Sequence, residues 1–182
     1  MELRKAVDNL LIYDPGFQKY ADKFVGEMGG SSAVQSVSST ADLKTAINSY
    51  TNVRFLEICL HGSPGVIYFA DKTAIIEKFF GAMMQNLLFL NKNARILFDN
   101  CNIGEGDAGD KFMDAIAEQM LKGKGGIVGA TTVKNEIYFY QTRFSTDAYM
   151  QPLSFGRLKV KKYDENGKLI TERLVDRHGI QR

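Results

Sequence analysis

The chain has 182 residues, enough to bury a full hydrophobic core within one domain. Its composition is that of an ordinary soluble globular protein, and its formal net charge of +2 excludes a general attraction to nucleic acid or membranes. No apolar run approaches the ~20 residues of a membrane span, and two cysteines cannot make a disulfide framework.

Apolar runs and amphipathic stretches alternate along the first 131 residues. Strands are predicted at residues 10–13, 33–37, 53–60, 66–69, 96–98 and 127–131, and helices at 17–28, 41–50, 73–90 and 110–121. Ser39 or Thr40 is the expected N-cap of the second helix. Such alternation requires right-handed crossovers, so we expect a mostly parallel sheet with helices on both faces.

The pattern changes after residue 132. Residues 136–140 are aromatic and favour a strand, whereas residues 147–155 are irregular. Residues 158–163 and 169–175 flank Asn166-Gly167, which predicts a β-hairpin because Asn-Gly tolerates positive φ. We therefore expect a single domain over residues 1–182, with a core at about 8–135 and a hairpin extension at about 156–176.

A cysteine follows the predicted strand at residues 96–98. The sequence there reads ILFDNCNIGEGDAGD, and Cys101 stands between the strand and the helix that begins near residue 110. Carboxyl ends of strands face the ligand crevice of an open α/β sheet, which makes Cys101 a candidate nucleophile. The alternative is a buried structural thiol, which the polar, glycine-rich surroundings disfavour.

One of the two histidines ends another predicted strand. The run VRFLEICL is followed by His61 and a glycine turn, HGSPG. Parallel strands would bring His61 and Cys101 to one rim of the sheet, where an imidazole favours the thiolate. The alternative is that His61 only closes the turn.

Together, LEICLHGSPG and ILFDNCNIGEGDAG resemble the His-Gly and Cys motifs of the caspase-like (clan CD) cysteine peptidases. The segments HGSPG, CNIGEGDAG and GGIVGATT are most similar to those of a caspase-like domain of large bacterial surface proteins. The resemblance covers roughly residues 8–135. It implies that the backbone N–H groups of Gly62 and Cys101 form an oxyanion hole, although Gly62 also fits a tight turn that needs glycine.

The resemblance also bears on specificity. Clan members that cut after arginine or lysine carry Asp-x-Cys, and this chain has Asp99-Asn100-Cys101. Asp99 and Cys101 would share one side if the strand continued that far. A carboxylate beside the nucleophile would bind a basic side chain. The alternative is that Asp99 caps a neighbouring turn or loop.

Metal sites are conceivable but poorly supported. Cys59, two residues before His61, would complete a Cys59, His61 and Cys101 set, but no fourth ligand or CxxC spacing accompanies it. Three acids near the helix start do not have EF-hand spacing and better suit a helix N-terminus: Glu105, Asp107 and Asp110.

The C-terminal hairpin is rich in basic residues. Toxin autoprocessing domains of this clan bind an inositol polyphosphate beside a β-hairpin, so the resemblance allows a polyanion activator here. The alternative is a solvated hairpin face. The basic residues are Arg157, Lys159, Lys161, Lys162, Lys168, Arg173, Arg177 and Arg182.

The sequence therefore predicts a caspase-like α/β sandwich, with a mostly parallel central sheet and a C-terminal hairpin. The expected function is a cysteine endopeptidase acting on protein or peptide substrates through His61 and Cys101, without metal or organic cofactor. The alternative is an inactive caspase-like binding or effector module. The N-terminus lacks the apolar core of a signal peptide, which predicts a cytoplasmic location and leaves export as an effector open.

Overall fold

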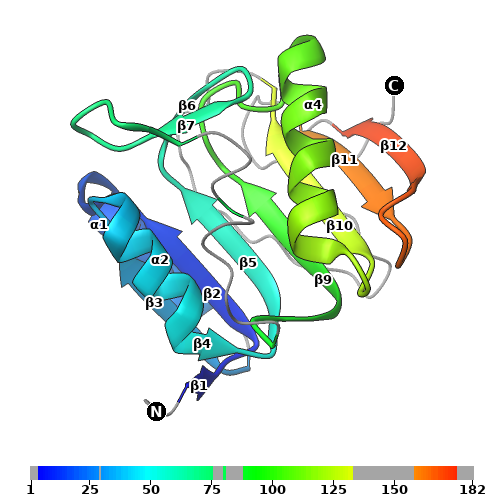
Figure 1. Cartoon of the computed structure of the whole chain (residues 1–182). Helices are drawn as coiled ribbons and strands as arrows, with labels where there is room; N and C mark the ends of the chain where they lie inside the picture. The colour runs from blue at the N-terminus through cyan, green and yellow to red at the C-terminus, as the bar shows by residue number, and fades with distance from the viewer. Residues whose placement is uncertain (1–3, 29, 76–79, 81–87, 133–157, 176–182) are drawn as a thin grey trace.

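The computed structural model describes residues 4–28, 30–75, 80, 88–132 and 158–175. Its main feature is a seven-stranded sheet with the strand order β12-β11-β10-β9-β5-β2-β3 (Figure 1). The strands are β2 (Asn9–Tyr13), β3 (Ser32–Ser36), β5 (Val53–Cys59), β9 (Leu90–Phe98), β10 (Gly126–Thr131), β11 (Leu158–Tyr163) and β12 (Leu169–Val175).

Most strands of this sheet run parallel. β3, β2, β5, β9 and β10 pair in parallel, whereas β11 and β12 add an antiparallel hairpin beside β10. The predicted mixed α/β fold with a large, mostly parallel sheet is confirmed. The hairpin strands have the bounds that the Asn166-Gly167 signal predicted, and Gly167 has the expected positive φ of 79°.

Side-chain alternation divides the core into two clusters, one on each side of the sheet. Leu10 and Ile12 of β2 belong to the larger cluster, and Leu11 and Tyr13 belong to the smaller one. Successive residues of a strand point to opposite faces, so the two clusters lie on opposite faces of the sheet.

Helices supply further apolar side chains to both clusters. Helix α1 (Gln18–Glu27), after the short 3-10 turn η1 (Pro15–Phe17), contributes Phe24 to the smaller cluster. Helices α2 (Thr40–Ser49) and α4 (Gly106–Ile116) contribute to the larger cluster, and α4 continues as the π-turn η2 (Ala117–Leu121). The predicted cap of α2 is Ser39, whose side chain accepts from Asp42 N–H.

Two smaller sheets flank the main one. β6 (His61–Ser63), β7 (Val66–Tyr68) and β8 (Ala74–Ile75) form an antiparallel sheet, and β1 (Lys5–Ala6) pairs with β4 (Tyr50–Thr51). Figure 1 shows β6 and β7 beyond the arrowhead of β5, at the carboxyl edge of the parallel strands. No helix in the described part of the chain is long and apolar enough to cross a membrane.

Three predicted elements differ from the structure or lie outside it. The helix predicted to begin at residue 73 does not begin there, because Ala74–Ile75 pairs with β7 as strand β8. Its predicted end at residue 90 is also wrong, since Leu90 begins β9. The predictions for residues 136–140 and 147–155 fall outside the described residues.

Helix α4 also binds the C-terminal hairpin through charged side chains. Lys161 Nζ of β11 lies 3.0 Å from both Asp110 Oδ1 and Asp114 Oδ1 of α4, although Lys161 is only 2% exposed. Lys159 Nζ donates to Asp110 Oδ1 at 2.7 Å, and Tyr163 OH donates to Asp114 Oδ1 at 2.7 Å. A buried ammonium group needs such partners, so this network fixes the hairpin against α4.

Close packing of α4 on the preceding loop gives a stability prediction. A Cβ at Gly109 would lie 2.2 Å from the carbonyl carbon of Gly104, which is backbone and cannot yield cheaply. We expect Gly109→Ala to lower the free energy of unfolding by roughly 2–3 kcal/mol, as overpacked sites do. Urea denaturation would measure this change.

The matched control is Gly26→Ala in α1. Gly26 is helical, and an added Cβ there would have no atom within 4 Å outside its own stretch of helix. Alanine is a better helix former than glycine, so this variant should gain about 0.5–1 kcal/mol. Equal effects of the two substitutions would contradict the packing argument.

Candidate functional site

The candidate site lies at the carboxyl edge of the parallel strands. Two segments meet there: the β6–β7 hairpin, which follows β5, and residues 99–104, which follow β9. Backbone hydrogen bonds join them to each other and to β10, from Gly65 N–H to Ile103 O at 3.0 Å and from Gly104 N–H to Thr131 O at 2.8 Å. The two sequence motifs are therefore in contact.

Gly62 packs directly against the cysteine loop. A Cβ at Gly62 would lie 2.7 Å from Asn100 Cβ and 3.1 Å from the Cys101 carbonyl oxygen. The Asn100 side-chain amide also donates to the His61 carbonyl at 3.4 Å. Gly62 lies in strand β6, and the turn with positive φ falls at Gly65 (φ 72°). Close approach therefore explains the glycine at position 62, and the tight-turn reading of that residue is wrong.

The His61 imidazole lies among two aromatic rings and one carboxylate. Its ring stacks on Tyr68, with centroids 5.9 Å apart and planes 12° apart, and contacts Phe17 at 5.4 Å. Its Nε2 lies 3.9 Å from Asp14 Oδ2. The side chain of His61 is 39% exposed and that of Asp14 only 4%. One part of the imidazole is therefore open to solvent, and Nε2 is directed at a buried acid.

Sequence reasoning did not identify Asp14. It follows β2 directly, in the sequence Asp-Pro-Gly, which reads as a turn, and the structure does place it as the cap of η1. The signal that could have found it is its position: β2 lies beside β5, so its carboxyl end adjoins His61.

The two cysteines lie in very different surroundings. Cys101 is partly exposed, whereas Cys59 is fully buried in the smaller cluster. Burial raises the pKa of the Cys59 thiol well above its usual value, and the negative charge of Asp99 raises it further. Cys59 is thus a neutral core thiol at neutral pH, as the sequence favoured.

Asp99 lies beyond the end of its strand. β9 ends at Phe98, and Asp99 N–H still bonds to Ile58 O at 3.0 Å before the chain turns at Asn100. The expectation that Asp99 and Cys101 share a side because the strand continues is therefore wrong in its premise. Both residues nevertheless lie within electrostatic reach of the Cys59 thiol.

A buried acid, Glu57, lies deeper on the same face of the sheet. Glu57 is fully buried in β5, and the Tyr20 hydroxyl of α1 donates to its Oε1. Burial, followed by the charge of Asp99, raises the pKa of the Glu57 carboxyl well above its usual value. A carboxyl held neutral costs less to bury than a carboxylate. Glu57 stands in an apolar run of the sequence, and nothing in that run indicated its hydrogen bond with Tyr20.

No metal cluster accompanies these residues in the described ranges, where no three His, Cys, Asp or Glu side chains are grouped to hold an ion. Asp107 lies in the first turn of α4, and Glu105 stands at the N-cap and accepts from Asn102 Nδ2 at 3.0 Å. The hairpin lysines Lys159 and Lys161 are bound to α4, so they are not exposed for a polyanion. The polyanion site stays a prediction for the other basic residues.

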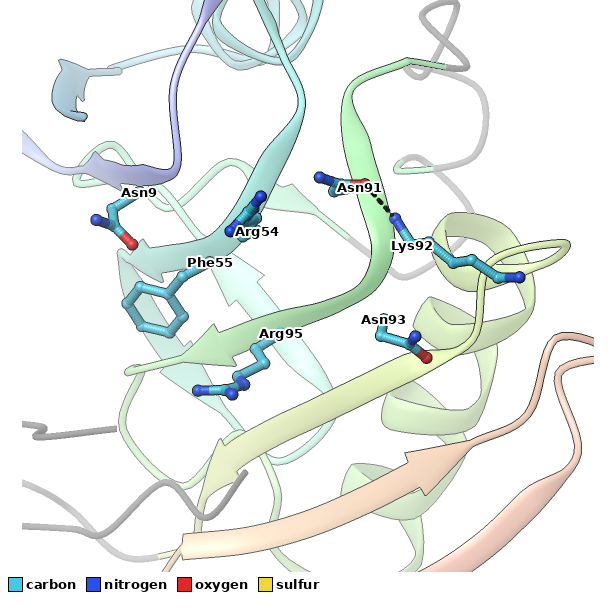
Figure 2. A pocket seen from close by; sticks show the side chains of 7 residues that line it. All are labelled: Asn9, Arg54, Phe55, Asn91, Lys92, Asn93 and Arg95. Atoms are coloured by element: carbon cyan, nitrogen blue, oxygen red, sulfur yellow. Dashed lines mark hydrogen bonds between the residues drawn. The ribbon is translucent and has the colours of Figure 1, made fainter. Parts of the chain in front are cut away.

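A hollow of about 500 Å³ lies at the opposite, amino edge of the parallel strands. Figure 2 shows Arg54 and Phe55 from β5 and Arg95 from β9 around it. Arg54 Nε pairs with Asp8 Oδ1 at 3.4 Å, and Lys92 Nζ, also lining the hollow, pairs with Glu165 Oε1 at 2.5 Å. The amino edge of the sheet therefore carries surface ion pairs, and it lies at the opposite end of the strands from His61 and Cys101.

The structure thus defines a mixed α/β protein whose histidine and cysteine motifs meet at the carboxyl edge of a mostly parallel sheet. A family model described as "Domain of unknown function (DUF4347)" matches residues 21–123, more than half of the chain. The chain belongs to this family. The matched segment contains both motifs and ends before the C-terminal hairpin.

One solved structure to which the chain is similar is a secreted C11 cysteine protease from Bacteroides thetaiotaomicron, in complex with an irreversible peptide inhibitor. The TM-score is 0.44 and the sequence identity 8%, over 72% of this chain and 50% of the protease. The chain thus spans about half the length of that protein, and so distant a likeness does not require a shared reaction. No curated protein matches the chain.

The contrast between the cysteines gives a labelling prediction. Cys101 is partly exposed, whereas Cys59 is buried with a raised pKa, so iodoacetamide near neutral pH should alkylate Cys101 at least ~100-fold faster. His61→Ala should slow labelling of Cys101 if the imidazole favours its thiolate. Peptide mass spectrometry over time would measure both rates, with Cys101→Ser as the control. Equal labelling of both cysteines, indifferent to His61, would contradict the pairing.

Glu57 gives a prediction on pH. Its carboxyl keeps its proton in the folded protein, because its pKa is raised, but loses it on unfolding above about pH 4.5. The contribution of this raised pKa to the free energy of unfolding is thus fully present below the unfolded pKa. That free energy falls by about 1.4 kcal/mol per pH unit as the pH rises towards the folded pKa.

The matched variant is Glu57→Gln, which keeps an oxygen to accept from Tyr20 but has no proton to lose. Urea denaturation at pH 5 and pH 8 should show wild type losing stability relative to this variant as the pH rises. A constant difference between the two proteins would mean that Glu57 is ionised in the folded state.

Proposed function

We propose that the chain is a caspase-like cysteine endopeptidase in which Cys101 is the nucleophile and His61 the proton-transfer group. One observation carries this proposal: the backbone at Gly62 packs against Asn100 and Cys101 with no room for a Cβ. A nucleophile and a base must be held together for covalent catalysis, and this contact holds the two motifs together.

The proposed reaction uses these side chains in two stages. The Cys101 thiolate, its proton having passed to His61, attacks the scissile carbonyl carbon and forms a C–S bond. His61 then gives that proton to the leaving amine as the C–N bond breaks. Water, deprotonated by His61, attacks the resulting thioester, releases the acid product and restores the thiol.

The backbone N–H groups of Gly62 and Cys101 are the proposed donors to the oxyanion that forms in each stage. Donors fixed by the surrounding structure stabilise a developing charge without reorganising. Gly62 lies in strand β6, whose register with β7 is fixed, and packs on the Cys101 loop. Rigid placement of both groups supports this role.

Asp99 is proposed to select a basic residue before the scissile bond. Its charge raises the pKa values of Tyr20, Glu57 and Cys59, so its carboxylate acts on a partly buried region next to the Cys101 loop. The raised pKa of Glu57 makes that residue unsuited to bind a cation, so the proposal assigns this role to the carboxylate of Asp99. A carboxylate in such a place favours a basic side chain and repels an acidic one.

Digestion of a peptide library by the purified protein tests activity and specificity together. We expect cleavage after Arg or Lys, abolished by Cys101→Ala. Asp99→Asn, which keeps the size of the side chain but removes its charge, should lower kcat/KM for such peptides about 10–100-fold, the loss of a charge-assisted hydrogen bond.

Each result bears on a different part of the proposal. Cleavage after Asp, Leu or Gly would refute the specificity but leave the peptidase. An absence of cleavage, with Cys101 no more reactive than Cys59, would refute the peptidase in favour of an inactive caspase-like binding module.

A further inference from the structure

We infer that Asp14 is the positioning residue of His61: its carboxylate holds the ring proton on Nε2 and leaves the Nδ1 lone pair for Cys101. The part played by Nδ1 rests on the proposed peptidase function. The position of the ring proton does not, because it follows from the surroundings of His61 alone.

The Asp14 carboxyl is held in a fixed orientation. Its Oδ1 accepts from Gly16 N–H at 2.8 Å, its own N–H donates to Cys59 O at 3.0 Å, and its carbonyl accepts from Phe17 N–H at 2.8 Å. These bonds tie the residue both to the turn that it caps and to the neighbouring strand. Only Oδ1 is used in the cap, so capping does not explain the position of Oδ2.

Asp14 Oδ2 is buried and has no hydrogen-bond partner within the described residues. A buried carboxylate oxygen without a donor is costly, so such an atom calls for an explanation. His61 Nε2, 3.9 Å away, is a group that can donate to it. The protein therefore places an unsatisfied acceptor opposite one nitrogen of the candidate catalytic histidine.

The separation is longer than a hydrogen bond, and a small movement of the ring would close it. Catalytic hydrogen bonds are often long before substrate binds and shorten in the complex. The imidazole is guided by its contacts with Phe17 and Tyr68. Phe17 belongs to the same turn as Asp14, so one turn places both an aromatic ring and a carboxylate beside His61.

The chemical consequence concerns the two nitrogens of the ring. In a neutral imidazole one nitrogen carries the proton, and the partner of the other decides which. A carboxylate opposite Nε2 keeps the proton there, so Nδ1 is the base. The same carboxylate stabilises the imidazolium that forms when the thiol gives up its proton, as an acid behind a catalytic histidine does.

The tautomer can be observed directly, since the chain has only two histidines, His61 and His178. In a His178→Gln background labelled with 15N-histidine, NMR at about pH 8, where an ordinary imidazole is neutral, reports which nitrogen is protonated. We expect the proton on Nε2. Asp14→Asn should move it to Nδ1, because the Gly16 amide retains the amide oxygen and turns the NH2 group towards His61.

Activity gives the second readout. Asp14→Asn should lower kcat at least ~100-fold with KM changed less than twofold, because the group acts through His61 and does not touch substrate. A purely structural role would lower the melting temperature, and leave both the tautomer and the kcat of the folded protein unchanged.

The outcomes separate this inference from the proposed function. A proton on Nδ1 in the wild-type background, or a tautomer and kcat indifferent to Asp14→Asn, would overturn the role of Asp14 and leave the peptidase intact. An Nε2 proton that depends on Asp14 in a protein that cleaves no peptide would support the inference and refute the peptidase.

Discussion

Contact between main chains at the carboxyl edge of the sheet is the constraint on which the site depends. Gly62 packs on Asn100, Gly104 packs on Ala130, and Gly109 packs on Gly104, each too closely for a Cβ. The β6–β7 hairpin, the cysteine loop, β10 and α4 are thereby stacked at van der Waals distance. These four elements therefore support one another through close backbone packing, and a catalytic geometry requires such support.

Acidic groups gather beneath these four elements. Asp99 raises the pKa values of both Cys59 and Glu57, and Asp14 raises that of Cys59, so these acids act near the ends of β2, β5 and β9. The protein limits the cost by keeping Glu57 neutral through burial. The negative charge that remains favours cations, which is consistent with the proposed imidazolium at His61 and with the proposed basic specificity.

The sequence was informative wherever a local pattern decided the structure. Apolar runs placed β2, β5 and β10 nearly to the residue, and Asn166-Gly167 placed the hairpin. The rule that parallel strands share a carboxyl edge also predicted that the two motifs meet, because both follow central strands. These features depend on periodicity and on turn chemistry, which a single sequence contains.

Features that depend on tertiary contacts were not predictable. HGSPG reads as a turn, yet His61–Ser63 is a strand because β7 is available to pair with it. Ala74–Ile75 likewise joins β7 in place of beginning a helix. β9 stops before Asp99-Asn100-Cys101, where Thr131 binds the Asn100 carbonyl. Asp14 resembled an ordinary turn residue, since nothing local indicates that an imidazole lies opposite its second oxygen.

The position of β2 also shows that the segment matched by the family model is not the whole folding unit. The family match begins at residue 21, after β2, yet β2 lies between β3 and β5 and bonds to both. A chain trimmed to the matched segment would lose the strand that joins β3 to the sheet and would expose the unpaired edge of β5. It would also lose Lys161, leaving Asp110 and Asp114 without that partner. The matched segment thus lacks strands that pair within the sheet, and the strand edges that it would expose favour aggregation.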